Sequence, residues 1–431
     1  MFKILIYTHE YPPFRGGAGV YSFDLAHGLA SIGTEVHVAT TLTESSIRAS
    51  ASFDSDSSNV HLHYLDNWQN SVTLARNFIL RLHLLNSFDI IVVTERIAQE
   101  VVSKIRYPFF RYASVVHGSE ILHYFGRNTN IPDVAQSRML RFYKNSLVNI
   151  AVSKATCILA QRLLKNDDVP LAVVQNGVNI RRLQDVDSLR VQEVRNKFPA
   201  NTEFVFSLGR LDLDKGHEIL ILAFKQVLRQ RPSARLLIGG DGPYRNRLVE
   251  LCCSLELEDS VCFLGNVSDA DLPTYYGLCD VFAMPSKSES RWEGFGLVFL
   301  EANYYEKPVI GGGEGGVVEA IANGETGYLV DPRNASDVAE AIEKLLHDKT
   351  LQTKLGRSGR QRVLGYFNSQ RMAKETLGVL MDNLTQKGET GRLKRCCSLV
   401  FYSIAYSLYA MEEIVRNMLK TLLTTRHRNG P

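Results

Sequence analysis

Short runs of apolar and β-branched residues alternate with longer stretches of helical periodicity in the first half of the chain. Helices are predicted over 20–31 and 72–85, where apolar residues recur every three or four positions. The predicted strands of this half are 3–8, 35–40, 60–65, 89–94, 113–117, 149–153 and 171–175. Repeated strand–helix–strand units predict a parallel sheet covered by helices.

The second half repeats this pattern after a polar interval. Residues 180–200 are rich in charge and lack a strong apolar period, which is typical of a linker. Helices are then predicted over 218–229, over 244–255 and directly after Gly296. The predicted strands of this half are 204–208, 234–238, 261–264, 281–284 and 308–311. The pattern therefore predicts an α/β protein with two doubly wound, Rossmann-like domains.

The stretch from Glu293 to Glu301 has the order loop, glycine turn and helix. Two glycines follow Glu293, and an apolar run over 297–300 continues from them. Glycine lets backbone N–H groups approach a ligand closely, and a helix that begins near Gly296 points its positive end at that ligand, which suits phosphate. Glu301 would then lie in the first helical turns, so both carboxylates can face one cleft.

Two cations flank the loop after the first strand of the second half. Arg210 and Lys215 enclose Asp212 and Asp214, and a predicted helix follows directly. Basic residues near a helix N-terminus are unfavourable unless an anion is bound there. A bound diphosphate would resolve this conflict. The alternative is a solvated loop in which the cations pair with the two aspartates.

A glycine-rich turn follows the first predicted strand, a position that binds anions in open α/β sheets. It contains Gly16, Gly17 and Gly19. The dinucleotide fingerprint G-x-G-x-x-G is not met, because Ser22 takes the third glycine position and the second strand ends without an acidic residue. The chain has no G-x-x-x-x-G-K-[ST] motif, so a P-loop nucleoside triphosphatase is excluded at the level of motifs.

A further candidate lies where a predicted strand ends, which is where ligands bind in open α/β sheets. His117 ends the strand predicted at 113–117. A single histidine at such a position can also be structural, so its position alone does not assign it a role.

The order and spacing of these motifs resemble the EX7E signature and the accompanying motifs of retaining glycosyltransferases of family 4, which have the GT-B fold. The resemblance covers about residues 3–386. It implies an acceptor-side domain, a linker, a nucleotide-sugar-binding domain, a helix that crosses back to the first domain, and an extension. These segments are placed at 1–180, 181–200, 201–366, 367–387 and 388–431. The two domains are expected to face a central cleft.

The resemblance also implies roles for individual residues. Glu301 would hold the ribose hydroxyls of a nucleotide-sugar, and Glu293 would lie beside the donor sugar and diphosphate. The implied catalytic residues are His117, Arg210, Lys215 and Glu293. The implied donor-binding residues are Gly16, Gly17, Arg210, Lys215, Val267, Glu293, Gly294, Phe295, Gly296, Leu297 and Glu301.

The implied reaction moves a hexose-type sugar from a UDP-, GDP- or ADP-linked donor to a hydroxyl of a sugar or lipid-linked acceptor, with retention of configuration. Cationic side chains would stabilise the leaving diphosphate. The spacing of Asp and His residues indicates no metal site, so neither a metal ion nor another cofactor is expected. The insert at 286–292 is longer than in many members and borders the donor sugar, so sugar specificity does not carry over.

Two alternatives remain at this point. One is a GT-B enzyme of synthase or phosphorylase type, for example one that cleaves sucrose reversibly. The other is a catalytically silent binding protein of the same fold, which would be expected to lack Glu293, Arg210 or Lys215, yet all three are present.

Composition favours a globular protein in a reducing compartment. Hydrophobic residues make up 45% and charged residues 22% of the chain. Seven cysteines occur without a C-x-x-C pair. The start of the chain does not read as a signal peptide, and no apolar run reaches the roughly 18 residues of a membrane span. A cytoplasmic location is expected.

The extension at 388–431 differs in charge from the rest of the chain. It holds seven Lys and Arg residues against three Glu, whereas the whole chain has a net charge of only +3. An aromatic-rich run at 399–411 lies between its basic ends. This pattern suits either peripheral contact with an anionic membrane or a helix packed on the body of the protein. The basic residues form no long cluster, so nucleic acid is not expected as a partner.

Overall fold

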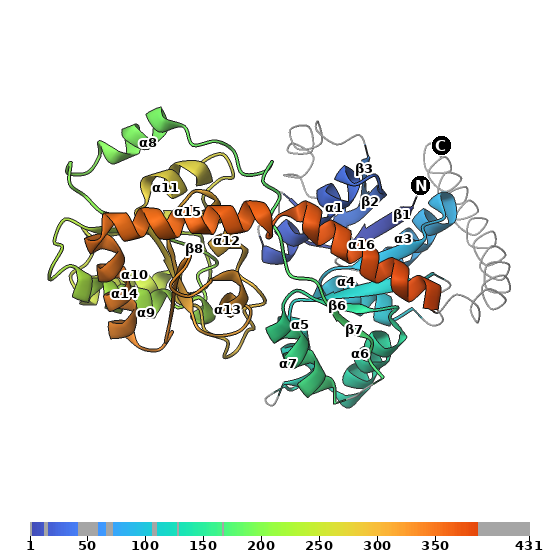
Figure 1. Cartoon of the computed structure of the whole chain (residues 1–431). Helices are drawn as coiled ribbons and strands as arrows, with labels where there is room; N and C mark the ends of the chain where they lie inside the picture. The colour runs from blue at the N-terminus through green and yellow to red at the C-terminus, as the bar shows by residue number, and fades with distance from the viewer. Residues whose placement is uncertain are drawn as a thin grey trace, which may run out of the picture.

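The computed structural model describes residues 2–386, with gaps at 13–15, 42–58, 66–71, 106–109, 127–128 and 166–167. The extension predicted at 388–431, and the membrane contact predicted for it, lie outside the described residues. The described chain forms two α/β domains, each built on one parallel sheet (Figure 1).

The first sheet has seven parallel strands in the order β3-β2-β1-β4-β5-β6-β7. Its strands are β1 (Lys3–Tyr7), β2 (Glu35–Thr41), β3 (Val60–Leu65), β4 (Ile90–Val93), β5 (Tyr112–Val116), β6 (Asn149–Ala151) and β7 (Leu171–Val173). The helices of this domain are α1 (Gly17–Ser31), α3 (Val72–Asn86), α4 (Arg96–Ser103), α5 (Ser119–Phe125), α6 (Asp133–Asn145) and α7 (Lys154–Leu164). Apolar side chains pack on both faces of the sheet, which explains why its central strands are almost continuously apolar.

The second sheet has six parallel strands in the order β10-β9-β8-β11-β12-β13. Its strands are β8 (Phe204–Leu208), β9 (Arg235–Gly239), β10 (Val261–Gly265), β11 (Val281–Met284), β12 (Val309–Gly312) and β13 (Gly327–Val330). Its helices are α9 (His217–Val227), α10 (Arg245–Ser254), α11 (Leu272–Leu278), α12 (Leu297–Tyr304), α13 (Val317–Ala320), α14 (Ala335–His347) and α15 (Lys349–Gly365). The doubly wound, two-domain prediction is confirmed.

Every strand predicted from the sequence is present, with ends shifted by at most about two residues, within the usual uncertainty of such boundaries. The four-residue strand β13 was not predicted. The stretch predicted as a linker contains a helix, α8 (Ser188–Arg195), in which no residue is fully buried. The sequence of α8 therefore shows only a weak helical pattern of apolar residues. Val191 and Val194 nevertheless pack against the core of the second domain.

The last helix, α16 (Ser369–Gln386), returns the chain to the first domain. Figure 1 shows α15 on the second domain and α16, which follows it, on the first. Met372 and Leu380 of α16 are fully buried in the core formed by α1 and the first sheet. Gly28 of α1 allows this close approach, because a Cβ atom built there would lie 2.5 Å from the carbonyl oxygen of Ser369. No helix among the described residues is long and apolar enough to cross a membrane.

Gly28→Ala should destabilise the packing of α1 against α16. The added methyl meets backbone rather than a movable side chain, so we expect the free energy of unfolding to fall by about 1–3 kcal/mol. Urea unfolding of the full chain measures this change.

Gly378→Ala is the matched control, because Gly378 lies in the same helix pair with nothing within 4 Å of an added Cβ. It should be neutral or stabilise by up to about 1 kcal/mol, since alanine is the better helix former. Equal unfolding midpoints for Gly28→Ala and the wild-type protein would contradict the packing argument.

Candidate active site

A pocket of about 2400 Å³ lies between the two domains, where the carboxyl ends of the strands of both sheets meet. Every site residue predicted from the sequence lines it: Gly16, Gly17, His117, Arg210, Lys215, Val267, Glu293, Gly294, Phe295, Gly296, Leu297 and Glu301. The structure therefore brings together residues that are up to 285 positions apart, from Gly16 to Glu301.

Lys215 and Glu293 pair with each other in this pocket. Lys215 Nζ lies 2.5 Å from Glu293 Oε2, and both side chains are largely shielded from solvent. Burial alone would lower the pKa of Lys215, but the Glu293 carboxylate outweighs that effect and the pKa is raised. Lysine is therefore held in its charged form. The alternative in which Lys215 pairs with Asp214 is not the arrangement observed.

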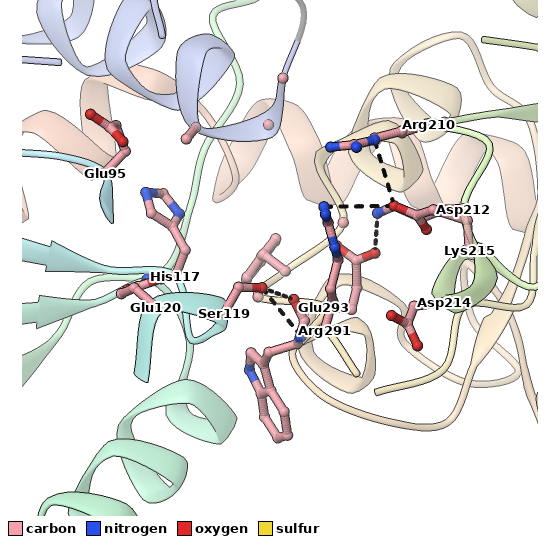
Figure 2. Close-up of a pocket in the computed structure, with 18 of the residues that line it drawn as sticks. Glu95, His117, Ser119, Glu120, Arg210, Asp212, Asp214, Lys215, Arg291 and Glu293 are labelled. Carbon is pink, nitrogen blue, oxygen red and sulfur yellow. Dashed lines mark hydrogen bonds and ion pairs between the residues drawn. The ribbon is translucent and has the colours of Figure 1, made fainter. Parts of the chain in front are cut away.

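Arg210 is held more loosely. Its Nε lies 3.9 Å from Asp212 Oδ2, and Arg291 Nη1 lies 3.7 Å from the same oxygen. These distances are too long for hydrogen bonds. Both arginine side chains are more than half exposed, so they can turn toward an anion. Figure 2 shows these cations on the second-domain side of the pocket, facing His117 and Glu95 on the other side.

The helix N-terminus predicted near Gly296 is present. Gly296 precedes α12 with φ at +85°, a left-handed conformation that favours glycine. The positive end of α12 therefore opens toward the pocket beside Lys215, which adds to the positive potential there.

Glu301 of α12 is almost fully buried and accepts hydrogen bonds on both oxygens. Arg182 Nη2 donates to Oε1 at 2.7 Å, and the Tyr276 hydroxyl donates to Oε2 at 3.1 Å. Arg182 Nε also lies 3.4 Å from Oδ1 of Asp24, a residue of α1 in the first domain. One guanidinium thus links a first-domain carboxylate to a second-domain carboxylate. Neither Arg182 nor Asp24 was predicted from the sequence.

His117 follows β5, and its ring is fixed by the first domain. Its Nε2 lies 2.8 Å from the carbonyl oxygen of Thr94. A carbonyl only accepts hydrogen bonds, so Nε2 carries the proton and Nδ1 of the neutral ring is an acceptor. The backbone N–H of His117 donates to Glu120 Oε1 at 2.6 Å.

Glu95 and Glu10 are two acidic residues on the first-domain side of the pocket, and neither was predicted from the sequence. Glu95 is buried, accepts from the first N–H groups of α4, and lies 2.8 Å from His9 Nδ1. Burial opposes its ionisation, but the hydrogen bond from His9 and those from the helix lower the pKa of Glu95 overall. Burial, together with Glu95, raises the pKa of Glu10. Glu10 lies against Gly16, where a Cβ atom would clash with its carboxylate.

The insert predicted at 286–292 joins the domains. Trp292 Nε1 donates to Thr156 Oγ1 at 2.9 Å, and the N–H of Trp292 donates to Ser119 Oγ at 3.2 Å. Its ring lies against Gly118, where φ is +103° and a Cβ atom would lie 2.1 Å from the indole. Asp214 stabilises the insert by accepting hydrogen bonds from the backbone N–H and the hydroxyl of Ser290.

Glu319 of α13 makes a second contact between the domains. Its two carboxylate oxygens accept from the N–H groups of Lys154 and Ala155 at 3.0 and 2.9 Å. Those are the first N–H groups of α7, so a second-domain carboxylate caps a first-domain helix. Nothing local in the sequence signals this cap, because 164 or more positions separate the partners.

Asp24→Asn tests the buried charge network. Burial raises the pKa of Asp24 to about 6, although Arg182 opposes this rise. The folded protein therefore binds this proton more tightly than the unfolded chain. Stability from the protonated group is present at low pH and is lost as pH rises through about 6.

We therefore compare the free energies of unfolding of the wild-type protein and of Asp24→Asn at each pH. The wild-type value minus the Asp24→Asn value should fall as the pH rises from about 4 to about 7. Urea unfolding across this range measures the difference. Asp382→Asn, at an exposed position on α16, should leave the pH dependence of the wild-type protein unchanged. Parallel curves for the wild-type protein and Asp24→Asn would show that Asp24 does not titrate in this way.

Comparison with known proteins follows the two-domain division. The family described as Glycosyltransferase Family 4 matches residues 15–182, and the family described as Glycosyl transferases group 1 matches residues 190–362. A GDP-mannose-dependent alpha-(1-6)-phosphatidylinositol monomannoside mannosyltransferase of Mycobacterium tuberculosis is 34% identical over 201 residues. That match covers 46% of this chain and 52% of the relative, so the chain spans about half the length of this mannosyltransferase.

Solved structures share the fold at low sequence identity. Sucrose-phosphate synthase from Thermosynechococcus elongatus has a TM-score of 0.73 and 23% identity, covering 90% of this chain and 100% of that one. Anabaena HepE in complex with UDP-glucose has a TM-score of 0.73 and 20% identity, covering 89% and 100%. With two matched families spanning both domains, the chain belongs to the group 1, family 4 glycosyltransferases, and its fold is GT-B.

Proposed function

We propose that this protein transfers a hexose-type sugar from a nucleoside diphosphate sugar to an acceptor hydroxyl, with retention of configuration and without a metal ion. The observation that carries the proposal is the interdomain pocket, in which cationic side chains, a helix N-terminus and two carboxylates converge. The named activities of relatives support the donor class, since one uses GDP-mannose and another was solved with UDP-glucose. The proposal covers UDP-, GDP- and ADP-linked donors.

In this proposal the donor diphosphate lies between Arg210, Lys215 and the N-terminus of α12. Breaking the bond between sugar and diphosphate builds negative charge on the leaving group, and preorganised cations stabilise that charge. Because Arg210 is loosely held, it can turn toward the diphosphate at little cost. Arg291 lies close enough to the same site to contribute a third cation.

Donor binding would also change the partner of Lys215. Lys215 and Glu293 neutralise each other in the structure. A diphosphate carries more charge than one carboxylate and would attract the lysine, leaving Glu293 free to face the sugar. A free carboxylate there orients the donor and stabilises the positive charge that develops on the sugar ring. We assign Glu293 this electrostatic role rather than that of a covalent nucleophile.

Glu301 would hold the ribose of the donor. Arg182 and Tyr276 each occupy one lone pair of the carboxylate, and each oxygen retains a second lone pair for a hydroxyl. Two ribose hydroxyls can therefore be accepted without releasing either protein partner. On the other side of the pocket, Nδ1 of His117 would accept a hydrogen bond from a hydroxyl of the transferred sugar.

Lys215→Met and Arg210→Ala should each lower turnover by about 10²-fold, because each removes charge stabilisation of the leaving diphosphate. Turnover should not change when EDTA is present. The measurement is initial-rate kinetics with a nucleotide-sugar identified by screening, with Lys225→Met and Arg357→Ala at exposed positions as matched controls.

Loss of turnover in EDTA and its recovery with Mg²⁺ would overturn the metal-independent mechanism. Full activity of Lys215→Met would remove that lysine from the mechanism. Screening acceptors, with fructose and its phosphate among them, tests the synthase-type alternative, because an enzyme that makes or cleaves sucrose transfers its sugar to and from one of these two acceptors.

We also propose that residues 388–431 bring the enzyme to an anionic membrane, where a lipid-linked acceptor would be concentrated. The support is the excess of Lys and Arg over Glu on either side of the aromatic run at 399–411. Each basic residue near an anionic surface contributes roughly 1 kcal/mol. In the structure α16 ends on the first domain, which is the acceptor-side domain of this proposal.

Removal of residues 388–431 should reduce co-sedimentation with phosphatidylserine-containing liposomes at low salt and leave donor binding unchanged. Liposomes of phosphatidylcholine alone are the control for charge. If the truncated chain melts at a markedly lower temperature and the intact chain ignores both kinds of liposome, the extension packs on the protein instead.

A further inference from the structure

A cluster of histidines lies at the edge of the first sheet, apart from the interdomain pocket. Residues two apart in a strand face the same side, which pairs Glu35 with His37 on β2 and His61 with His63 on β3. The register places His37 directly beside His61. All four side chains therefore gather on one face of the β2–β3 pair.

The possible ligand atoms are already close together. One carboxylate oxygen of Glu35 and one ring nitrogen from each of His37 and His61 lie within 4.8 Å of one another. In a tetrahedral zinc site the metal–ligand distances of about 2.0–2.2 Å place neighbouring ligand atoms about 3.3 Å apart. Glu35 Oε1 and His37 Nε2 lie 3.1 Å apart, so mainly His61 has to move. His61 is exposed and its side chain is free of the core.

His63 holds the ring of His37 in place. Its Nε2 lies 2.7 Å from His37 Nδ1, and the two rings are stacked with an interplanar angle of 4°. In the structure His37 Nε2 donates to Glu35 Oε1, because a carboxylate oxygen only accepts, and His37 Nδ1 accepts from His63 Nε2. A metal ion at Nε2 takes the place of that proton, and Nδ1 can then donate to His63, since metal-binding histidines donate their second ring N–H to an acceptor.

We propose that Glu35, His37 and His61 form a binding site for a divalent transition-metal ion such as Zn²⁺, with His63 orienting His37 and water completing the coordination. Imidazole and carboxylate ligands suit zinc, and three protein ligands with one open position are a common zinc arrangement. Glu35 begins β2, whereas the pocket lies at the opposite, carboxyl ends of the strands. The bound ion fixes the edge strand β3 to β2 and takes no part in sugar transfer.

Lys3 competes with the metal for Glu35. Its Nζ lies 2.9 Å from Glu35 Oε1, and about a third of its side chain is exposed, so it can swing into solvent. The backbone N–H of Lys3 donates to Asp89 Oδ2, which is independent of this competition. Removing the ammonium group leaves Glu35 free to bind the ion.

Zinc titration of the full chain, made without a histidine tag and stripped of metal, tests the proposal by calorimetry and thermal shift at pH 7.5. The wild-type protein should bind Zn²⁺ at a single site and melt at a higher temperature when it is bound. His61→Gln should weaken binding by at least about 10-fold, and His63→Gln by about 10-fold or more through loss of orientation. Lys3→Met should bind several-fold more tightly.

His347→Gln is the matched control, because His347 is an exposed histidine on α14 in the other domain. It should bind Zn²⁺ as the wild-type protein does. Equal affinity in His61→Gln and the wild-type protein, or weaker binding in Lys3→Met, would overturn the proposal.

The test is independent of the reaction. If EDTA abolished turnover while His61→Gln remained active, sugar transfer would require a metal ion bound elsewhere. That result would contradict metal-independent transfer but would not contradict the proposed histidine site. A lowered melting temperature in EDTA with unchanged turnover agrees with both proposals.

Discussion

The position of the two domains depends most directly on the buried guanidinium group of Arg182. Only 7% of its side chain is exposed, and it lies between Asp24 of the first domain and Glu301 of the second. A buried charge is stable only when it is paired, and removing one partner of such a network typically costs about 3–5 kcal/mol. Glu301 also lines the pocket. The Arg182 guanidinium that joins the domains therefore also orients Glu301, a proposed donor-binding side chain.

Other contacts between the domains lie equally close to the pocket. Trp292 packs on Gly118, next to His117, and Gly294, next to Glu293, lies against the carbonyl oxygen of His117. Glu319 caps α7 from the second domain. Neither glycine could carry a Cβ atom without a clash. The domains therefore meet through the same loops that carry the proposed chemistry, and moving one domain would move those loops.

Local sequence patterns predicted every described strand except β13, and together with the family resemblance they predicted part of the pocket lining, but not Glu10, Glu95 or Arg182. Central strands such as β4 are continuous apolar runs, and glycines beside carboxylates mark the turn before α12. The interactions that were missed join residues far apart in the sequence. Arg182 meets Glu301 across 119 positions, and Trp292 meets Thr156 across 136. The histidine cluster was missed for the same reason, since it forms only through the register of two neighbouring strands.

Thermal-shift measurements of the full chain with UDP-, GDP- and ADP-sugars test the central claim most directly, which is that the interdomain pocket binds a nucleotide-sugar. A ligand that binds the native state raises the melting temperature by mass action. We predict that the melting temperature rises with the nucleotide-sugars that share one base, and rises less with the matching nucleoside monophosphate. In Glu301→Gln the rise with the same nucleotide-sugars should be smaller. The absence of any rise with all three classes of nucleotide-sugar, from a protein that is folded and otherwise stable, would contradict the account.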